Sequence, residues 1–282
     1  MSRLQLGRVD YINYIPVYHA LEEGLVPLEA DLVKGTPDRL NKLFVSGKLA
    51  ATPISSIEYA RHSENCLVLP DLSISVDGRS ADILLFSKMP VTELEGKKIS
   101  LTKSSASSAT LLKILFVHYY QVEVEYRTDA PDLDKMMKKA DGALLIGDSA
   151  MAAHQRVKDL KLPYYVTDLG EVWKQFTGEK FVFAIWVIQR SLAENNPDMA
   201  ELICRTLRES KKISAGCRKD LISKAQARSG LPLRVIEDCY ANLRLDFDES
   251  YRRALLAFYD YAYKGGLIEE RVKLRLWGEV SE

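Results

Sequence analysis

Short hydroxyl, amide and carboxyl side chains gather at four places where an apolar, strand-like run ends and a helical pattern begins. These junctions are Asp10-Tyr11-Ile12-Asn13, Pro53-Ile54-Ser55-Ser56, Thr102-Lys103-Ser104-Ser105-Ala106-Ser107-Ser108 and Gly147-Asp148-Ser149. The first turn of a helix exposes unpaired N–H groups and a partial positive charge, which together favour a bound anion. Serine and asparagine add neutral hydrogen-bond donors. The junctions therefore predict a cleft that binds a small anionic molecule.

The serine-rich junction can serve two compatible roles. The first is capping: at least one of its hydroxyls is expected to cap the helix that follows. The second is ligand binding, because a cap uses only one or two of the hydroxyls of Ser104, Ser105, Ser107 and Ser108. We interpret this junction as a helix start that also holds a carboxylate.

The other junctions carry the same choice between local structure and ligand binding. One of Ser55 and Ser56 is expected to cap the next helix, and both are candidates for ligand contact. Asn13 is either a turn residue or a ligand-binding residue. Asp148 is either an N-cap or an acceptor for a substrate hydroxyl. Because each follows a different strand, they meet only if those strand ends share one rim.

Strands and helices alternate along most of the chain, which is typical of an α/β fold with a mostly parallel sheet. In such a sheet the turns that follow the strands lie along the rim where ligands bind. Two apolar strands, Ile83–Ser87 and Phe181–Ile188, bracket a segment that can form its own lobe. We predict a discontinuous first lobe of residues 1–87 and 183–282, a second lobe of residues 88–182, and a ligand cleft between them.

The last third of the chain changes character after Pro197 and reads as helical. Helices are expected over Met199–Cys217, Lys219–Ala227, Leu233–Asn242, Glu249–Lys264 and Ile268–Leu276. No internal repeat or low-complexity linker separates them from the preceding strands. We expect this helical C-terminal region to pack on the first lobe.

Charge and hydropathy exclude several classes of protein. Lysine plus arginine and aspartate plus glutamate each number 39, so the formal net charge is zero. That balance argues against binding nucleic acid by neutralising phosphates. No apolar run approaches the ~18–20 residues that span a bilayer, and no secretory signal is visible at the start of the sequence. We expect a cytoplasmic protein with a small-molecule substrate and no nucleic-acid or membrane partner.

The residues that usually bind metals show no metal-binding spacing. The cysteines form no C-x-x-C pair; they are Cys66, Cys204, Cys217 and Cys239. The histidines all fall inside expected helices; they are His19, His62, His118 and His154. Dinucleotide-binding, P-loop and G-x-S-x-G motifs are also missing. We expect neither a metal nor a cofactor.

A series of short motifs runs in order over almost the whole chain. The series is Gly7-Arg8-Val9-Asp10-Tyr11-Ile12-Asn13, Gly35-Thr36-Pro37-Asp38-Arg39-Leu40-Asn41, Pro53-Ile54-Ser55-Ser56-Ile57-Glu58-Tyr59-Ala60, Leu69-Pro70-Asp71-Leu72-Ser73-Ile74-Ser75, Ser105-Ala106-Ser107-Ser108, Leu144-Leu145-Ile146-Gly147-Asp148 and Asp168-Leu169-Gly170-Glu171-Val172-Trp173. Each motif alone is weakly specific. The ordered set resembles the chorismate dehydratases of the futalosine route to menaquinone.

This resemblance implies a two-lobed, periplasmic-binding-protein-like fold of type II. It also implies dehydration of chorismate to 3-[(1-carboxyvinyl)oxy]benzoate without a cofactor. We predict three catalytic residues, Asn13, Ser107 and Asp148. The predicted substrate-binding residues are Ser55, Ser56, Ser105, Ser108 and Trp173. Trp173 is expected in a wall of the cleft, with core packing as its alternative.

The chemistry agrees with the donors at the junctions. Chorismate carries two carboxylates and loses water from adjacent ring carbons. Donors at the ring carboxylate would stabilise a dienolate-like transition state. No general base is evident at the junctions, so we hypothesise that the substrate's enolpyruvyl carboxylate removes the proton. An ionisation-first path through an allylic cation is the alternative.

Two other functions fit the same architecture. The sister enzyme 1,4-dihydroxy-6-naphthoate synthase resembles the chain, but that family has a histidine base where this chain has Gly147 and Asp148. A non-catalytic solute-binding protein would also fit the fold. The lack of a visible export signal and of a lipid-anchor cysteine favours the enzyme.

Overall fold

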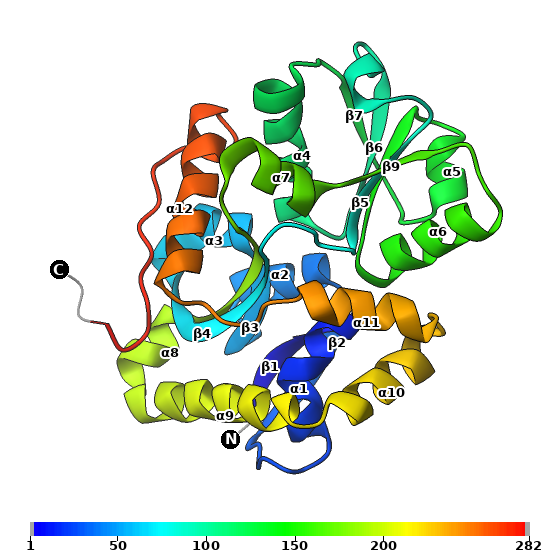
Figure 1. Ribbon diagram of the computed structural model, residues 1–282. Helices are drawn as coiled ribbons and strands as arrows, with labels where there is room; N and C mark the ends of the chain where they lie inside the picture. Colours follow the sequence, from blue (N-terminus) through cyan, green and yellow to red (C-terminus); the bar gives the residue numbers. More distant parts are fainter. Residues whose placement is uncertain (1–2, 280–282) are drawn as a thin grey trace.

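The computed structural model describes residues 3–279 and contains two five-stranded sheets. The strand order is β2-β1-β3-β10-β4 in the first sheet and β7-β6-β8-β5-β9 in the second. Figure 1 shows the two sheets in separate lobes, each flanked by its own helices. The predicted two-lobed α/β architecture is confirmed.

The first sheet combines a parallel part with an antiparallel strand that crosses over from the second lobe. Its strands are β1 (Leu4–Val9), β2 (Ala30–Gly35), β3 (Ala51–Ser55), β4 (Cys66–Val76) and β10 (Phe181–Gln189). β1 pairs in parallel with β2 and β3, whereas β10 runs antiparallel to β3 and β4. The sheet is less parallel than predicted because β10 enters it from the opposite end.

The second sheet corrects the predicted lobe boundary. Its strands are β5 (Ile83–Ser87), β6 (Lys98–Thr102), β7 (Glu125–Asp129), β8 (Gly142–Ile146) and β9 (Tyr165–Asp168). β6 pairs in parallel with β7 and β8, and β5 lies antiparallel between β8 and β9. The predicted first lobe, 1–87, included β5, but the backbone hydrogen bonds of β5 are made in the second sheet. Because β5 begins at Ile83 and pairs only with strands of the second sheet, the chain has already crossed into the second lobe before residue 83.

Helices cover both sheets. Those of the first lobe and the C-terminal region are α1 (Ile15–Glu22), α2 (Pro37–Val45), α3 (Ser56–His62), α8 (Arg190–Asn195), α9 (Pro197–Ala215), α10 (Arg218–Ser229), α11 (Leu233–Asn242) and α12 (Glu249–Lys264). Those between β6 and β10 are α4 (Ala106–Leu115), α5 (Leu133–Met137), α6 (Gly147–Asp159) and α7 (Leu169–Thr177). Helix α9 packs along α1, and α12 packs on β10.

The prediction of a last helix over Ile268–Leu276 is wrong. This segment runs without regular structure beside β4, and Leu276 forms an isolated bridge with Val68. The backbone N–H of Val68 donates to the carbonyl oxygen of Arg275, and the backbone N–H of Trp277 donates to the carbonyl oxygen of Val68. Pairing along the edge strand β4 satisfies backbone groups that the helix would otherwise have satisfied internally.

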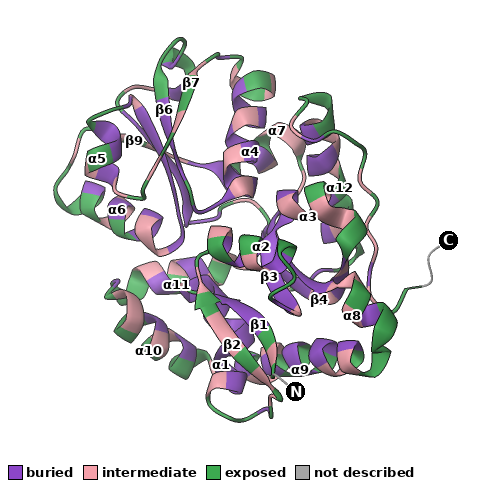
Figure 2. Ribbon diagram, turned by 180° about the vertical axis from the view of Figure 1, so that it is seen from behind, coloured by how far each residue is buried: buried purple, intermediate pink, exposed green. Residues whose placement is uncertain are grey.

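The largest apolar core is continuous across the two lobes. One cluster of buried side chains includes Ile185 of β10 as well as Leu85 and Ile99 of the second sheet. Figure 2 shows the central strands of both sheets as largely buried, whereas the edge strands β2 and β7, the loops and the outer faces of the helices carry the exposed residues. Within this core, Trp186 Nε1 donates to the Tyr18 hydroxyl at 2.9 Å. That bond links α1 to β10.

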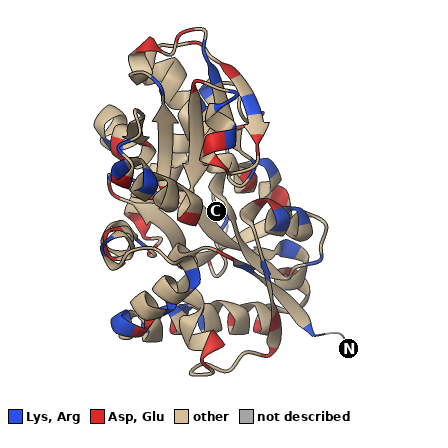
Figure 3. Cartoon of the chain, turned by 90° about the vertical axis from the view of Figure 1, so that its right-hand side faces the viewer, with Lys and Arg blue, Asp and Glu red and all other residues tan. Residues whose placement is uncertain are grey.

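Charged residues of both signs lie on the outer helices and loops, while the central strands carry few of them (Figure 3). This mixed surface matches the formal net charge of zero. Within residues 3–279, no helix is long and apolar enough to cross a membrane.

Candidate functional site

A small cavity lies where strand ends and helix starts of the two lobes meet. Its polar lining comes from both lobes and from the crossing between them, and consists of Tyr11, Asn13, Tyr14, Ser55, Asp82, Ser105 and Ser108. Four of the predicted site residues therefore meet at one cavity, as expected of strand ends that share a rim: Asn13, Ser55, Ser105 and Ser108.

In this conformation the cleft is nearly closed. The cavity volume is ≈ 30 Å³, room for about two water molecules. Pockets that hold drug-sized ligands occupy roughly 300 Å³ or more. The cavity in this conformation is therefore too small for a ligand of that size.

A larger groove of ≈ 560 Å³ adjoins this cavity and shares Ser105 with it. It runs between α2 and α3 on one side and α4 on the other. Two of its basic residues are paired, Lys42 with Asp38 and Arg61 with Glu58. Lys103 and Lys113 also line it and, among the described residues, form no ion pair within 4.0 Å. Their charge can draw an anion toward the cavity.

The serine-rich junction combines capping with exposure to the cavity, as predicted. Ser105 is the N-cap of α4, and its hydroxyl accepts a hydrogen bond from the Ser108 backbone N–H at 3.2 Å. The Ser105 hydroxyl in turn donates to the Ser108 hydroxyl at 2.9 Å. Both side chains line the cavity while they stabilise the helix start.

Ser55 has a different local role from the predicted one. It occupies the N-cap position of α3, but its side chain makes no capping hydrogen bond. The prediction that Ser55 or Ser56 caps this helix is therefore wrong, because the Ser56 hydroxyl donates to the Val182 carbonyl at 2.7 Å instead. The Ser55 hydroxyl lies in the cavity lining and is available to a ligand.

Ser56 and Ser107 form a buried link between the lobes. Their hydroxyl oxygens lie 3.0 Å apart, and Ser107 Oγ accepts from the Ile57 N–H at 3.1 Å. Because the Ser56 proton goes to Val182, the Ser107 hydroxyl donates to Ser56. Both serines are fully buried outside the cavity lining. The structure thus gives them a structural task, and their roles toward substrate stay predictions.

Asp82 is the site residue that sequence reasoning missed. It lies on the crossing between β4 and β5, is 5% exposed, and its Oδ2 accepts from Asn13 Nδ2 at 2.9 Å. The other amide atom, Asn13 Oδ1, is buried and has no partner among the described residues. A single aspartate before an apolar strand gives no signal in the sequence. Only the fold brings it to Asn13, which lies far away in the chain.

The environment of Asp82 keeps its carboxyl neutral. Its pKa is raised to about 8, mainly by burial and also by the nearby carboxylates Asp168 and Asp148, while the Asn13 hydrogen bond acts in the opposite direction and lowers it. No cation pairs with Asp82 within the part of the chain that the structure describes. At neutral pH this carboxyl can therefore donate a proton.

Asp148 connects the lobes but does not line the cavity. Its Oδ1 accepts from the Ile12 N–H at 3.0 Å, just before Asn13. It lies inside the first turn of α6, whose N-cap is Ile146, so the predicted alternative of a plain N-cap is wrong. Burial raises the pKa of Asp148. Its contact with Ile12 makes it a positioning residue for the Asn13 turn.

Trp173 lies in the core rather than in the cavity. It is fully buried, and its Nε1 donates to the Lys180 carbonyl at 3.0 Å. Its ring packs edge-on against Phe181 and Tyr261. The structure therefore favours the core alternative for this residue, because α7 turns its apolar face inward and away from the cavity lining.

The neutral state of Asp82 predicts a pH-dependent stability difference. The ordinary aspartate pKa is ~3.9, so between this value and about 8 only the folded protein holds the proton. Folding stability of the wild type therefore falls as pH rises through that window. The Asp82→Asn variant lacks this loss, so its free energy of unfolding relative to wild type should increase from about pH 5 to about pH 8. Urea unfolding measured at several pH values tests this, and a constant difference would contradict it.

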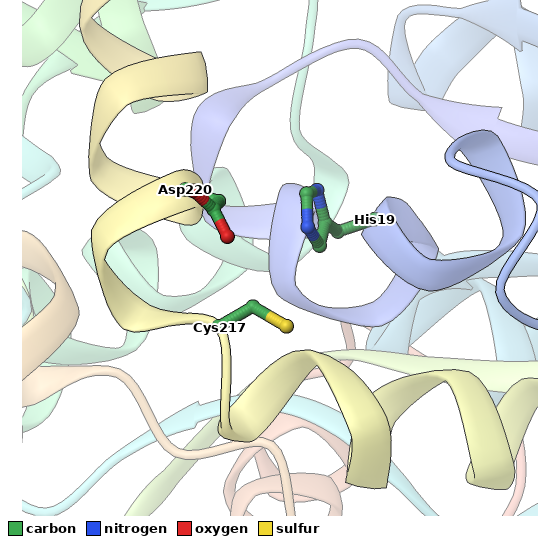
Figure 4. Close-up of side chains that lie close together, drawn as sticks. All are labelled: His19, Cys217 and Asp220. Carbon is green, nitrogen blue, oxygen red and sulfur yellow. The ribbon is translucent and has the colours of Figure 1, made fainter.

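One group of metal-binding residue types does come together, contrary to the sequence expectation. His19 of α1 lies with Cys217 and Asp220 at the start of α10, their ligand atoms within 4.8 Å of one another. Figure 4 shows the three side chains turned toward a common space. The spacing rule missed them because they are brought together by helix packing across about two hundred residues of sequence. None of the three lines the cavity.

The position of this cluster predicts that removing metals has no effect on turnover at the cavity. The three side chains lie on the α1–α10 contact of the first lobe, outside the cavity lining. Treatment with a chelator should therefore leave the rate within error of the untreated protein. A loss of rate that added zinc restores would contradict this prediction.

The family described by its role in menaquinone biosynthesis matches residues 4–264. A chorismate dehydratase from Thermus thermophilus is 31% identical over 265 residues, which cover 90% of this chain and 93% of that relative. A 1,4-dihydroxy-6-naphthoate synthase from the same organism is 25% identical over 200 residues, 69% of each protein.

Among solved structures, the periplasmic aliphatic sulphonate binding protein SsuA from Escherichia coli has the same fold. The TM-score is 0.67 at 17% identity, and the match covers 99% of this chain and 95% of that one. This likeness concerns the fold alone and confirms the predicted periplasmic-binding-protein-like architecture. The family match over most of the chain and the 31% identity over 93% of a relative lead to one conclusion: the chain belongs to the menaquinone biosynthesis family.

Proposed function

We propose that this protein is a chorismate dehydratase, a carbon–oxygen lyase that converts chorismate to 3-[(1-carboxyvinyl)oxy]benzoate and water. The observation that carries the proposal is the set of neutral donors that both lobes present to one cavity. Ser55 comes from the first lobe at the start of α3, and Ser105 and Ser108 come from the second lobe at the start of α4. The resemblance of the whole chain to such enzymes points in the same direction.

The charge of chorismate fits these two helix starts. Each carboxylate can take donors from one lobe, so that the dianion bridges the cleft and favours its closure. The basic groove beside Ser105 can guide the dianion inward. Asn13 lines the same cavity, and its buried amide oxygen Oδ1, which has no partner among the described residues, can accept from the substrate hydroxyl.

The elimination removes a proton and a hydroxide from adjacent ring carbons. The departing proton is vinylogous to the ring carboxylate, so donors at that carboxylate stabilise the charge that develops there. We infer that the enolpyruvyl carboxylate of the substrate accepts the proton. No histidine, lysine or arginine lines the cavity among the described residues, and this lining supports a base supplied by the substrate.

The residues that follow β8 also distinguish this function from the naphthoate synthase alternative. A naphthoate synthase of this resemblance would place a histidine after the strand that here leads to Gly147 and Asp148. Purified protein offered chorismate and, in parallel, the cyclic futalosine intermediate should consume only chorismate. Formation of a naphthoate product would transfer the assignment to the sister enzyme. Binding of either compound without turnover would favour a solute-binding protein.

A further inference from the structure

We propose that Asp82 is the catalytic acid that protonates the departing hydroxyl group, an inference that rests on the proposed dehydratase function. The elimination needs a proton at the leaving oxygen, because hydroxide is a poor leaving group. Among the residues that the structure describes, Asp82 supplies the one carboxyl group of the cavity lining. All other polar side chains of that lining are hydroxyls or the Asn13 amide.

The hydrogen bonding around Asp82 prepares it for this task. Asn13 Nδ2 donates to one carboxyl oxygen, Asp82 Oδ2, across a 2.9 Å contact between the first lobe and the crossing segment. This bond fixes the carboxyl plane and leaves its proton to point elsewhere. Asn13 Oδ1 remains buried without a partner. Asp82 and Asn13 thus offer a donor and an acceptor side by side, the pair that one substrate hydroxyl can satisfy.

Apart from the Asn13 amide that donates to it, the titratable groups around Asp82 oppose its ionisation. The titratable groups that face it are Asp148 of α6, Asp168 before α7, Tyr11 just before η1 (Ile12–Tyr14), Tyr14 at the end of η1, and Cys239 of α11. None of these groups is a cation, and two are carboxyls. Asp168 is occupied elsewhere, because it accepts hydrogen bonds from the backbone of Ser80 and Ala81. A neutral Asp82 is the arrangement of lowest charge.

The proton balance of the proposed step is complete. The ring carbon that bears the enolpyruvyl ether loses its proton to the substrate's own carboxylate, and the bonding electrons enter the ring. The bond from the adjacent carbon to oxygen breaks, and the leaving oxygen takes the proton of Asp82 to form water. Asp82 is left as a carboxylate. It regains a proton from the carboxylic acid of the product or from solvent before the next turnover.

The Asp82→Asn variant tests the proposal, since asparagine keeps the shape and can still accept from Asn13 Nδ2. We expect kcat to fall by roughly 10²–10⁴-fold, with a KM for chorismate within about threefold of wild type, because binding depends on the serine donors. In the wild type, kcat/KM should fall as pH rises through the titration of Asp82, and this alkaline limb should be missing in the variant. The control Asp141→Asn, a carboxyl outside the cavity that pairs with Lys88, should keep the wild-type rate and profile.

The outcomes separate this inference from the proposed function. A wild-type protein that does not turn over chorismate overturns both. A wild type that is active while Asp82→Asn keeps its rate, or keeps the alkaline limb, overturns the role of Asp82 alone. If the variant fails to fold, the wild-type pH profile still decides: a kcat/KM that stays flat through the alkaline range overturns the proposal.

Discussion

Replacing Asn13 with alanine should reduce turnover of chorismate by roughly 10²–10³-fold, the loss typical of removing one hydrogen-bonding group from a developing charge. Asn13 is 6% exposed in the cavity, holds Asp82 through its Nδ2, and keeps Oδ1 free. The alanine variant loses the acceptor for the substrate hydroxyl and the donor that orients the Asp82 carboxyl. Steady-state kinetics with chorismate measure the effect, and we expect it mainly in kcat.

Asn41 offers a matched control for Asn13. It is a buried asparagine of α2, 8% exposed, and its Oδ1 also has no partner among the described residues. It lies in the wall of the neighbouring groove and outside the cavity. The Asn41→Ala variant should keep kcat within about threefold of wild type. Equal losses in both variants would show that burial of an amide, rather than its position in the cavity, explains the result.

Replacing Ser107 with alanine should lower the free energy of unfolding by about 1–3 kcal/mol, the usual cost of leaving a buried polar group without its partner. Ser107 Oγ accepts from the Ile57 N–H and donates to Ser56, and all of this occurs in the buried contact between α3 and α4. The alanine variant leaves the Ile57 N–H unsatisfied. Urea unfolding monitored by circular dichroism measures the loss.

An exposed serine provides the control for this stability effect. The Ser46 hydroxyl donates to the Leu43 carbonyl at the end of α2, in contact with solvent. Ser46→Ala should change the free energy of unfolding by no more than about 0.5 kcal/mol. If Ser107→Ala is equally mild, the buried link between α3 and α4 does not contribute to stability as its geometry indicates.

Local patterns in the sequence predicted the elements that carry the site. The serine cluster starts a helix, Ser105 caps it, and Ser108 faces the same cavity as Asn13 and Ser55. These features depend on capping chemistry and on strand ends that share a rim, which act over a few residues and recur in many proteins.

What the sequence did not predict depends on long-range pairing. β5 joined the second sheet because β8 and β9 both offer it antiparallel partners. Asp82 became a site residue because that crossing carries it to Asn13. The segment 268–276 has a helical pattern but forms edge contacts with β4 instead. In each case a tertiary partner, invisible in the local pattern, decided the outcome.

The proposed dehydration of chorismate is tested most directly by identifying the product that the wild-type protein forms. Purified protein is incubated with chorismate, with and without a chelator, and the mixture is followed by ultraviolet absorbance and mass spectrometry. The account predicts that chorismate disappears while one new aromatic product, lighter by one molecule of water, accumulates at the same rate in both samples. Chorismate that remains intact after prolonged incubation with folded protein would contradict it.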